Sequence, residues 1–146
     1  MILVSACLLG INCKYNGGNN KIEGLKELLK NEILIPVCPE QLGGLETPRL
    51  PSEIIQKNEG RHVVDKKGND LTVQFLKGGE ETLKIAKMFN IKKAILKSNS
   101  PSCGCGNIYD GTFTGKIVEG DGITAAILKS NNIKIFNELN YLEKLK

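Results

Sequence analysis

The sequence lacks most of the features that identify metal and nucleotide sites directly. Histidine occurs once, at His62, and there is no Cys-x-x-Cys pair. Cys103-Gly-Cys105 is also too closely spaced for a zinc-finger knuckle. The glycines at 17–18 and 104–106 complete neither a Walker nor a dinucleotide fingerprint. These absences disfavour zinc, give a nucleotide cofactor little support, and leave His62 as an expected surface or satisfied core residue.

An export signal and a long apolar run are absent as well. The opening run MILVSACLLGI has no basic leading segment, becomes polar at Asn12 and is too short to span a bilayer. We therefore interpret it as a buried strand and expect no membrane association. Five cysteines without an export signal indicate a reducing cytoplasm, where thiols serve metals or catalysis more often than disulfides. The net charge of +4 is mild and the lysines form no block, which indicates an ordinary solvated surface with at most weak attraction to RNA.

What the sequence does contain is an alternation of strand and helix patterns. The chain has 146 residues, of which 40% are apolar and 25% charged, and no repeat or linker divides it, so we expect one domain over 1–146. Short apolar runs predict strands at 2–6, 33–37, 93–97 and 133–136. Helical spacing predicts helices near 22–29, from residue 72 onward and at 121–130. This order predicts an α/β fold: an open, mainly parallel, Rossmann-like sheet with helices on both faces and long Gly/Pro-rich loops at its C-terminal edge.

Finer details follow from the breaker residues. Pro36 lies inside the second predicted strand and places it near an edge or a bulge. The Gly/Pro-rich segment 41–61 is expected to be a long loop with one helical turn at 52–56. We expect residues 62–65 and 70–72 to form a small hairpin, and Gly78-Gly79 to bend the long helix.

Three cysteines, Cys7, Cys38 and Cys103, stand where predicted buried strands end. The carboxyl ends of parallel strands share one edge of the sheet, so these thiols are expected to meet in one crevice. Such an all-sulfur donor set suits an iron–sulfur cluster, and three thiolates would leave one iron open as a Lewis acid. Cys13 and Cys105 are alternative or fourth ligands, and a four-thiolate cluster would favour electron transfer or a structural role instead.

Polar residues follow the same strand ends. Glu40 comes two residues after Cys38, where a carboxylate can act as a general base on water. Ser100 and the amides of its Gly-rich loop offer neutral donors to a heterocycle. Further candidates for contacts with a substrate come from these loops, namely Ser102, Tyr109, Asp110 and Arg49.

Three long motifs in this order resemble the thiouracil desulfurase family, formerly a bacterial domain of unknown function. They are VSACLLG with CKYNG at 4–10 and 13–17, PVCPEQLGGLETPR at 36–49, and LKSNSPSCG with IYDGTFTG at 96–104 and 108–115. The resemblance covers nearly the whole chain. Lys14 and Asn16 stand where Arg and Asp are common, and Ser98 and Asn99 where Glu and Arg often stand, which would alter substrate contacts without touching the cysteines.

The resemblance implies an oxygen-sensitive 4Fe-4S cluster held by Cys7, Cys38 and Cys103, with the fourth iron free. It implies non-redox conversion of C=S to C=O in a thiolated pyrimidine, in which that iron takes the thiocarbonyl sulfur, water attacks the carbon and sulfide leaves. Glu40 and Ser100 correspond to the assisting acid and serine. Because the sequence does not continue into the additional domain that some relatives carry, a free base or nucleoside is a better expectation than a thiolated tRNA. The alternatives are a sulfur or iron–sulfur carrier, a structural metal protein, or a nucleotide-binding module with incidental thiols.

Overall fold

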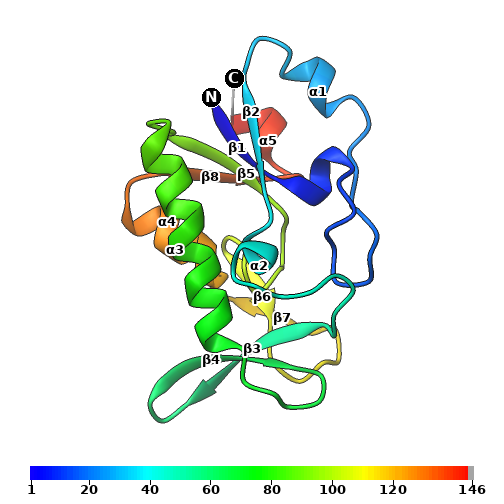
Figure 1. Ribbon diagram of the computed structural model, residues 1–146, viewed down its shortest axis with the longest axis vertical. Coiled ribbons are helices and arrows are strands. Elements are labelled where there is room, and N and C mark those ends of the chain that lie inside the picture. Colours follow the sequence, from blue (N-terminus) through cyan, green and yellow to red (C-terminus); the bar gives the residue numbers. More distant parts are fainter. Residues whose placement is uncertain (145–146) are drawn as a thin grey trace.

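A four-stranded parallel sheet forms the centre of the fold in the computed structural model, which describes residues 1–144 (Figure 1). Its strands, in the spatial order β2-β1-β5-β8, are β2 (Leu34–Val37), β1 (Ile2–Ser5), β5 (Lys93–Leu96) and β8 (Lys134–Asn137). All three neighbouring pairs are parallel. The predicted parallel sheet is therefore confirmed, and so is the edge position of the strand that carries Pro36.

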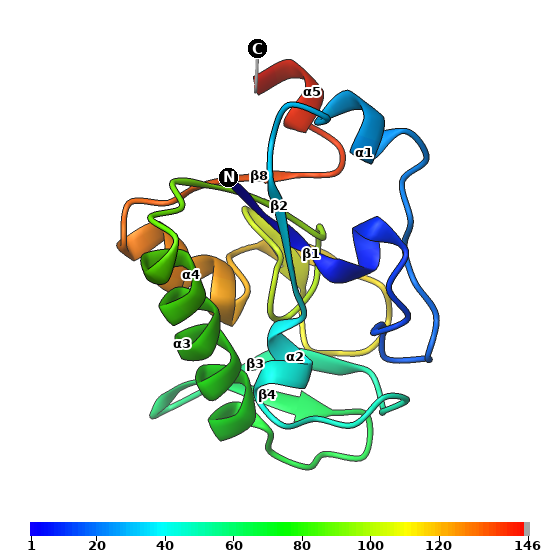
Figure 2. The same ribbon diagram turned by 45° about the horizontal axis from the view of Figure 1, so that its top comes forward.

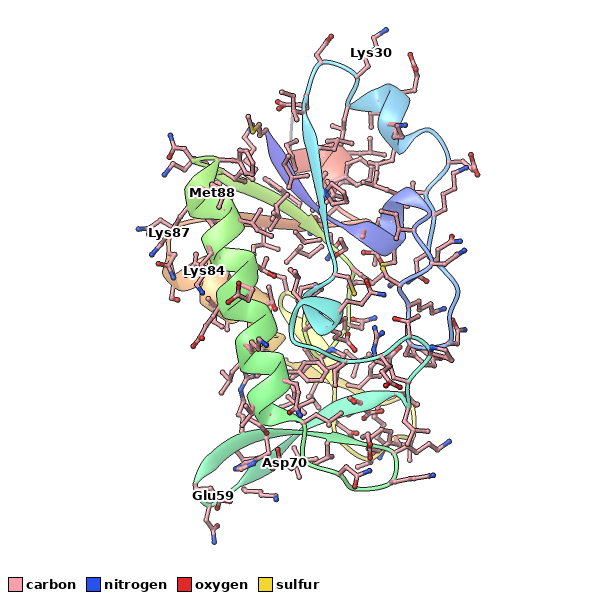
Figure 3. All side chains as sticks on the ribbon, in the orientation of Figure 1. Lys30, Glu59, Asp70, Lys84, Lys87 and Met88 are labelled. Atoms are coloured by element: carbon pink, nitrogen blue, oxygen red, sulfur yellow. The ribbon has the colours of Figure 1, made fainter. Side chains whose placement is uncertain are left out.

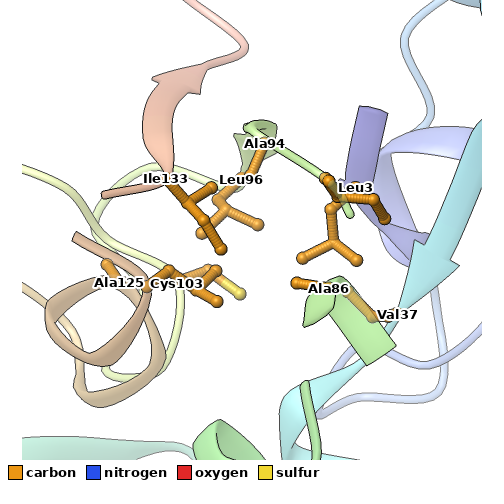
Figure 4. Packing of buried hydrophobic residues seen from close by; sticks show 10 residues of the cluster. Leu3, Val37, Ala86, Ala94, Leu96, Cys103, Ala125 and Ile133 are labelled. Atoms are coloured by element: carbon orange, nitrogen blue, oxygen red, sulfur yellow. The ribbon is translucent and has the colours of Figure 1, made fainter. Parts of the chain in front are cut away.

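Helices cover both faces of this sheet, as the alternating strand–helix pattern predicts (Figure 2). The helices that pack on it are α1 (Leu25–Leu28), α3 (Thr72–Met88), α4 (Ile123–Ser130) and α5 (Tyr141–Lys144). Leu3 and Leu96 belong to the cluster formed with α3 and α4, part of which Figure 4 shows. Val4 and Ile95 belong to the opposite cluster, with α1 and α5. Neighbouring strand residues thus enter different cores, which is why these strands are continuous apolar runs.

Two antiparallel hairpins stand at the C-terminal edge of the sheet, where long loops were expected. The first joins β3 (Ser52–Lys57) to β4 (Gly60–Asp65), and the second joins β6 (Asn107–Tyr109) to β7 (Ile117–Glu119). The predicted helical turn at 52–56 is therefore wrong, and residues 62–65 pair with β3, while Asp70 makes only an isolated bridge to Val64. The adjacent apolar residues Ile54 and Ile55 interrupt the alternation of apolar and polar residues that identifies a strand, so the sequence of β3 carries no strand signal.

Helix α3 runs unbroken through Gly78-Gly79, so the expected bend is absent (Figure 1). Gly78 instead allows close packing against the short helix α2 (Pro39–Leu42) and the glycine that follows it, whereas Gly79 packs against Thr124 and Ile127 of α4. A Cβ on Gly78 would overlap the carbonyl oxygen of Pro39, and one on Gly43 would overlap that of Gln74. This contact fixes α2, and therefore Glu40 in its first turn, at the end of β2.

The outer surface is charged, and the polar side of α3 shows this clearly. Figure 3 shows Lys84 and Lys87 projecting from α3 away from the sheet, and Glu59 and Asp70 at the β3–β4 end of the molecule.

Within residues 1–144, none of the helices combines the length and apolar character that crossing a bilayer requires. The predicted helix near 22–29 is shorter than expected, because only the single turn α1 forms.

Candidate metal centre

A cavity of about 550 Å³ opens at the C-terminal edge of the sheet, between the strand ends and the two hairpins. The strand order reverses at this place, because the chain moves from β1 to β2 on one side and later adds β5 and β8 on the other. Such a reversal leaves a crevice beyond the carboxyl ends of the strands. The fold therefore places this cavity where open α/β proteins bind their ligands.

Cys7, Cys38 and Cys103 all line this cavity. Cys7 lies in the 3-10 helix Ala6–Leu9 that follows β1 directly, Cys38 is the N-cap residue of α2 after β2, and Cys103 lies in the loop after β5. Because β2, β1 and β5 are neighbours in the sheet, the structure brings the three predicted thiols together.

Burial sets the protonation of two of these thiols. It raises the pKa of Cys7 above its usual value, although a hydrogen bond with Asn20 opposes the effect. It raises the pKa of Cys103 to about 12, because this side chain belongs to the apolar cluster that includes Leu96 and Ala125 (Figure 4). Both are therefore neutral thiols near pH 7 without a metal, and a metal bound by either would displace its proton, since the thiolate is the form that coordinates metals.

Cys13 also lines the cavity and interacts with Cys38. As a thiol, Cys38 donates to the carbonyl oxygen of Cys13 over 3.7 Å, and as a thiolate it accepts a hydrogen bond from the Cys13 thiol. That bond lowers the pKa of Cys38 and raises that of Cys13. The pair thus favours Cys38 as the thiolate and keeps the proton on Cys13. Cys105, the other spare cysteine, lies outside this cavity, in a shallow surface hollow with Lys129 and Lys134.

Glu40 lines the cavity and is held by a nearly buried arginine. Arg49 donates through Nε to Glu40 Oε1 at 3.0 Å, and the side chains are 10% and 16% exposed, respectively. The same guanidinium donates to the carbonyl oxygens of Cys13 and Glu46 and to the Thr47 hydroxyl, at 2.9 to 3.1 Å. Arg49 therefore ties the carboxylate to the loop that carries Cys13.

The second oxygen of Glu40 ends a chain of hydroxyls. Ser102 Oγ donates to Glu40 Oε2 at 3.0 Å, so the Ser100 hydroxyl, 2.9 Å away, is the donor to Ser102 Oγ. Ser100 Oγ also accepts from the backbone amides of Ser102 and Cys103, each at 3.1 Å. All three side chains line the cavity, and together they form a path for a proton from Ser100 through Ser102 to the carboxylate.

The remaining predicted residues divide into those at the cavity and those elsewhere. Tyr109 lines it, whereas Asp110 is not among the lining residues and instead accepts hydrogen bonds from the amide and hydroxyl of Thr112 in its own turn. His62 lies on β4, away from the cavity, with Nδ1 2.7 Å from Asp70 Oδ2. Sequence reasoning missed Phe113 and Glu53, which line the cavity from the two hairpins that were expected as loops.

The donor set fits a cluster better than a single ion. Across residues 1–144, no three His, Cys, Asp or Glu side chains stand close enough together to hold one metal ion. The four irons of a cubane occupy separate corners, so its thiolates stand farther apart than the ligands of one ion. Three thiols that line one cavity are the donor type that such a cluster takes.

Comparison with known proteins agrees with this geometry. Residues 2–140 match the family described as 2-thiouracil desulfurase. Uncharacterized protein YbbK of Bacillus subtilis (strain 168) is 45% identical over 148 residues, which cover 96% of this chain and 98% of that protein. A solved structure, the [4Fe-4S]-dependent thiouracil desulfidase TudS (DUF523Vcz), is 41% identical and superposes with a TM-score of 0.88 over 97% of this chain and 93% of that one.

Proposed function

The chain belongs to the 2-thiouracil desulfurase family, and we propose that it replaces the sulfur of thiouracil by oxygen with the aid of a [4Fe-4S] cluster. The observation that carries this proposal is the convergence of Cys7, Cys38 and Cys103 on one cavity that also contains a carboxylate joined to two serines. The family resemblance seen in the sequence is confirmed by the match over residues 2–140.

Three thiolates are the proposed protein ligands of the cluster. Cys13 interacts with Cys38, and its protonated form is favoured, which argues against Cys13 as a fourth ligand. Cys105 lies outside the cavity, which argues against Cys105 as well. When bound with three ligands, the cluster supplies an open iron, a Lewis acid with affinity for the thiocarbonyl sulfur.

The polar residues of the cavity handle the protons of the attacking water. Water adds its oxygen to the carbon, the C–S bond breaks, and the products are C=O and sulfide, so no electrons enter or leave. We assign Glu40 as the general base. Ser100 takes a proton from the water and passes its own to Ser102, and Ser102 passes its own to the Glu40 carboxylate. Arg49 orients the carboxylate, because it holds the oxygen that Ser102 does not contact.

The cavity limits the substrate class. A volume of about 550 Å³ is typical of small-molecule sites and supports a thiouracil-type base or its nucleoside as the substrate. Lys14, Lys66 and Lys97 also line the cavity, and they would attract polar oxygens of such a ligand.

The proposal is tested by anaerobic reconstitution with iron and sulfide. We expect a brown protein that holds about four irons per chain, as one cubane requires, and that releases sulfide from 2-thiouracil. Cys7→Ser, Cys38→Ser and Cys103→Ser should each lose the cluster, whereas the matched control Cys105→Ser should keep both cluster and turnover. A folded, colourless protein after reconstitution would overturn the proposal. Loss of the cluster in Cys13→Ser or Cys105→Ser would point to a four-ligand carrier instead.

A further inference from the structure

Phe113 has a backbone conformation that its side chain disfavours. It lies in the turn between β6 and β7 with φ of 58°. Among residues 1–144, the other three non-glycine residues with positive φ are all asparagines, which tolerate this region well. A phenylalanine does not, so the surrounding structure must hold it there, and such enforced conformations cluster at ligand sites.

A buried carboxylate from the other hairpin holds the turn. Glu53 of β3 is 9% exposed, and its Oε1 accepts from the amides of Gly111 and Phe113 at 3.0 and 3.2 Å. Gly111 lies so close to β3 that a Cβ there would stand 2.7 Å from the carbonyl oxygen of Ile54. The turn is therefore clamped against β3 on both sides of Thr112.

The clamp presents Phe113 to the cavity, which it lines together with Tyr15 and Tyr109. One face of the Tyr15 ring already lies under Lys14, whose Nζ is 5.7 Å from the ring centroid. Tyr109 lies within the paired part of β6, where it faces Ile117 across the ladder. Of these aromatic residues, Phe113 is the one that the fold holds in a disfavoured backbone conformation. Its ring has no polar group that needs a hydrogen-bond partner.

We propose that the Phe113 ring stacks on the pyrimidine of the substrate and determines specificity for planar rings, and that Glu53 is the positioning residue for it. Pyrimidines stack readily on aromatic side chains, and this interaction does not depend on the substituents of the ring. The inference rests on the proposed function, because it concerns the substrate of the same cavity. It adds a recognition element that neither the cysteines nor Glu40 supplies.

Phe113→Asn tests the stack in the reconstituted protein. Asparagine suits the positive φ, so we expect unchanged iron content and an unfolding temperature no lower than that of the wild type. The KM for 2-thiouracil, and the Kd for the product uracil measured by anaerobic equilibrium dialysis, should rise about 5- to 150-fold, which corresponds to loss of one base–aromatic stack. The value of kcat should change little. Phe113→Tyr should restore near wild-type binding, and the control Phe89→Asn, at an exposed aromatic residue outside the cavity, should leave binding unchanged.

Glu53 variants test the clamp separately. Glu53→Ala leaves two amides without their acceptor and should raise KM as Phe113→Asn does, whereas Glu53→Gln keeps an acceptor oxygen and should recover most of the binding. Equal affinity of wild type and Phe113→Asn for uracil would overturn the inference. A wild type that binds 2-thiouracil but releases no sulfide would refute the proposed function and leave the stack standing, provided that Phe113→Asn still weakens binding.

Discussion

Removal of the arginine that holds the candidate general base should destabilise the protein strongly. Arg49→Met keeps much of the side-chain volume but leaves Glu40 as a nearly buried carboxylate without its cation, since the two side chains are only 10% and 16% exposed. Loss of one partner of a buried ion pair costs about 3–5 kcal/mol. For a chain of this size that is about 6–20 °C in unfolding temperature.

The structure separates two sources of this cost. Arg49 also donates to two backbone carbonyl oxygens and to the Thr47 hydroxyl, and those bonds are lost whatever the charge of Glu40. The stranded carboxylate is the other source, and Glu40→Gln removes it. We therefore expect the Arg49→Met/Glu40→Gln double variant to be more stable than Arg49→Met alone, with an interaction free energy of about 0.5–3 kcal/mol.

Urea unfolding of the reduced protein, followed by circular dichroism, measures these differences. Lys84→Met is the control, because it removes a surface pair with Glu81, in which the side chains are 69% and 37% exposed, and should leave the midpoint nearly unchanged. A double variant no more stable than Arg49→Met would refute the reasoning. Arg49 would then stabilise the protein only through its hydrogen bonds to the two loops and not as the partner of a buried charge.

Three other substitutions test separate parts of the structure. Ser102→Ala removes the middle hydroxyl of the proton path and should lower kcat by about 10²-fold or more at unchanged iron content; an unchanged kcat would contradict the path. Gly78→Ala should lower the unfolding temperature more than Gly79→Ala, because the first Cβ meets a backbone carbonyl and the second the movable end of a side chain; equal effects would argue against the close packing of α2. Hydrogen bonds from Thr72 hold the pKa of Asp70 below its usual value, so its contribution to stability is complete above the pKa of the unfolded chain and is lost as the pH falls through the lower folded value. Asp70→Asn should therefore be less stable than the wild type at pH 7 but not in strong acid, and a gap that persists in acid would contradict this origin.

The parts of the fold that sequence patterns predict are those whose signal is local. Continuous apolar runs identified the four parallel strands, and the strand ends then placed Cys7, Cys38 and Cys103 at one edge. Helix α3 was equally visible, because its apolar positions recur over many turns. Pro36 marked the edge strand, since a missing amide is tolerated best there.

The parts that were missed depend on contacts between distant segments. Strand β3 has no period of two, and it forms because β4 and the β6–β7 turn cover it. The bond from Phe113 to Glu53 joins residues 60 positions apart, so neither residue carries a local signal for it. The role of Gly78 also depends on a distant partner. In the sequence, this glycine indicates only a possible break in the helix, whereas in the structure its missing side chain makes room for the carbonyl group of Pro39.

Two of the proposed cluster ligands and the proposed stacking residue lie on different parts of the fold, and that difference has physical consequences. Thiolate ligands must keep fixed positions, and two of the three proposed ones, Cys7 and Cys38, lie within two residues of the ends of strands in a sheet covered on both faces. Phe113, the proposed stacking residue, lies in the turn of the β6–β7 hairpin, beyond the loop that carries Cys103, and is bonded to β3 through the Glu53 carboxylate. On this proposal, a substitution of the Phe113 side chain should weaken ring binding without moving Cys7 or Cys38, whereas a substitution of either cysteine should remove the cluster and the activity together.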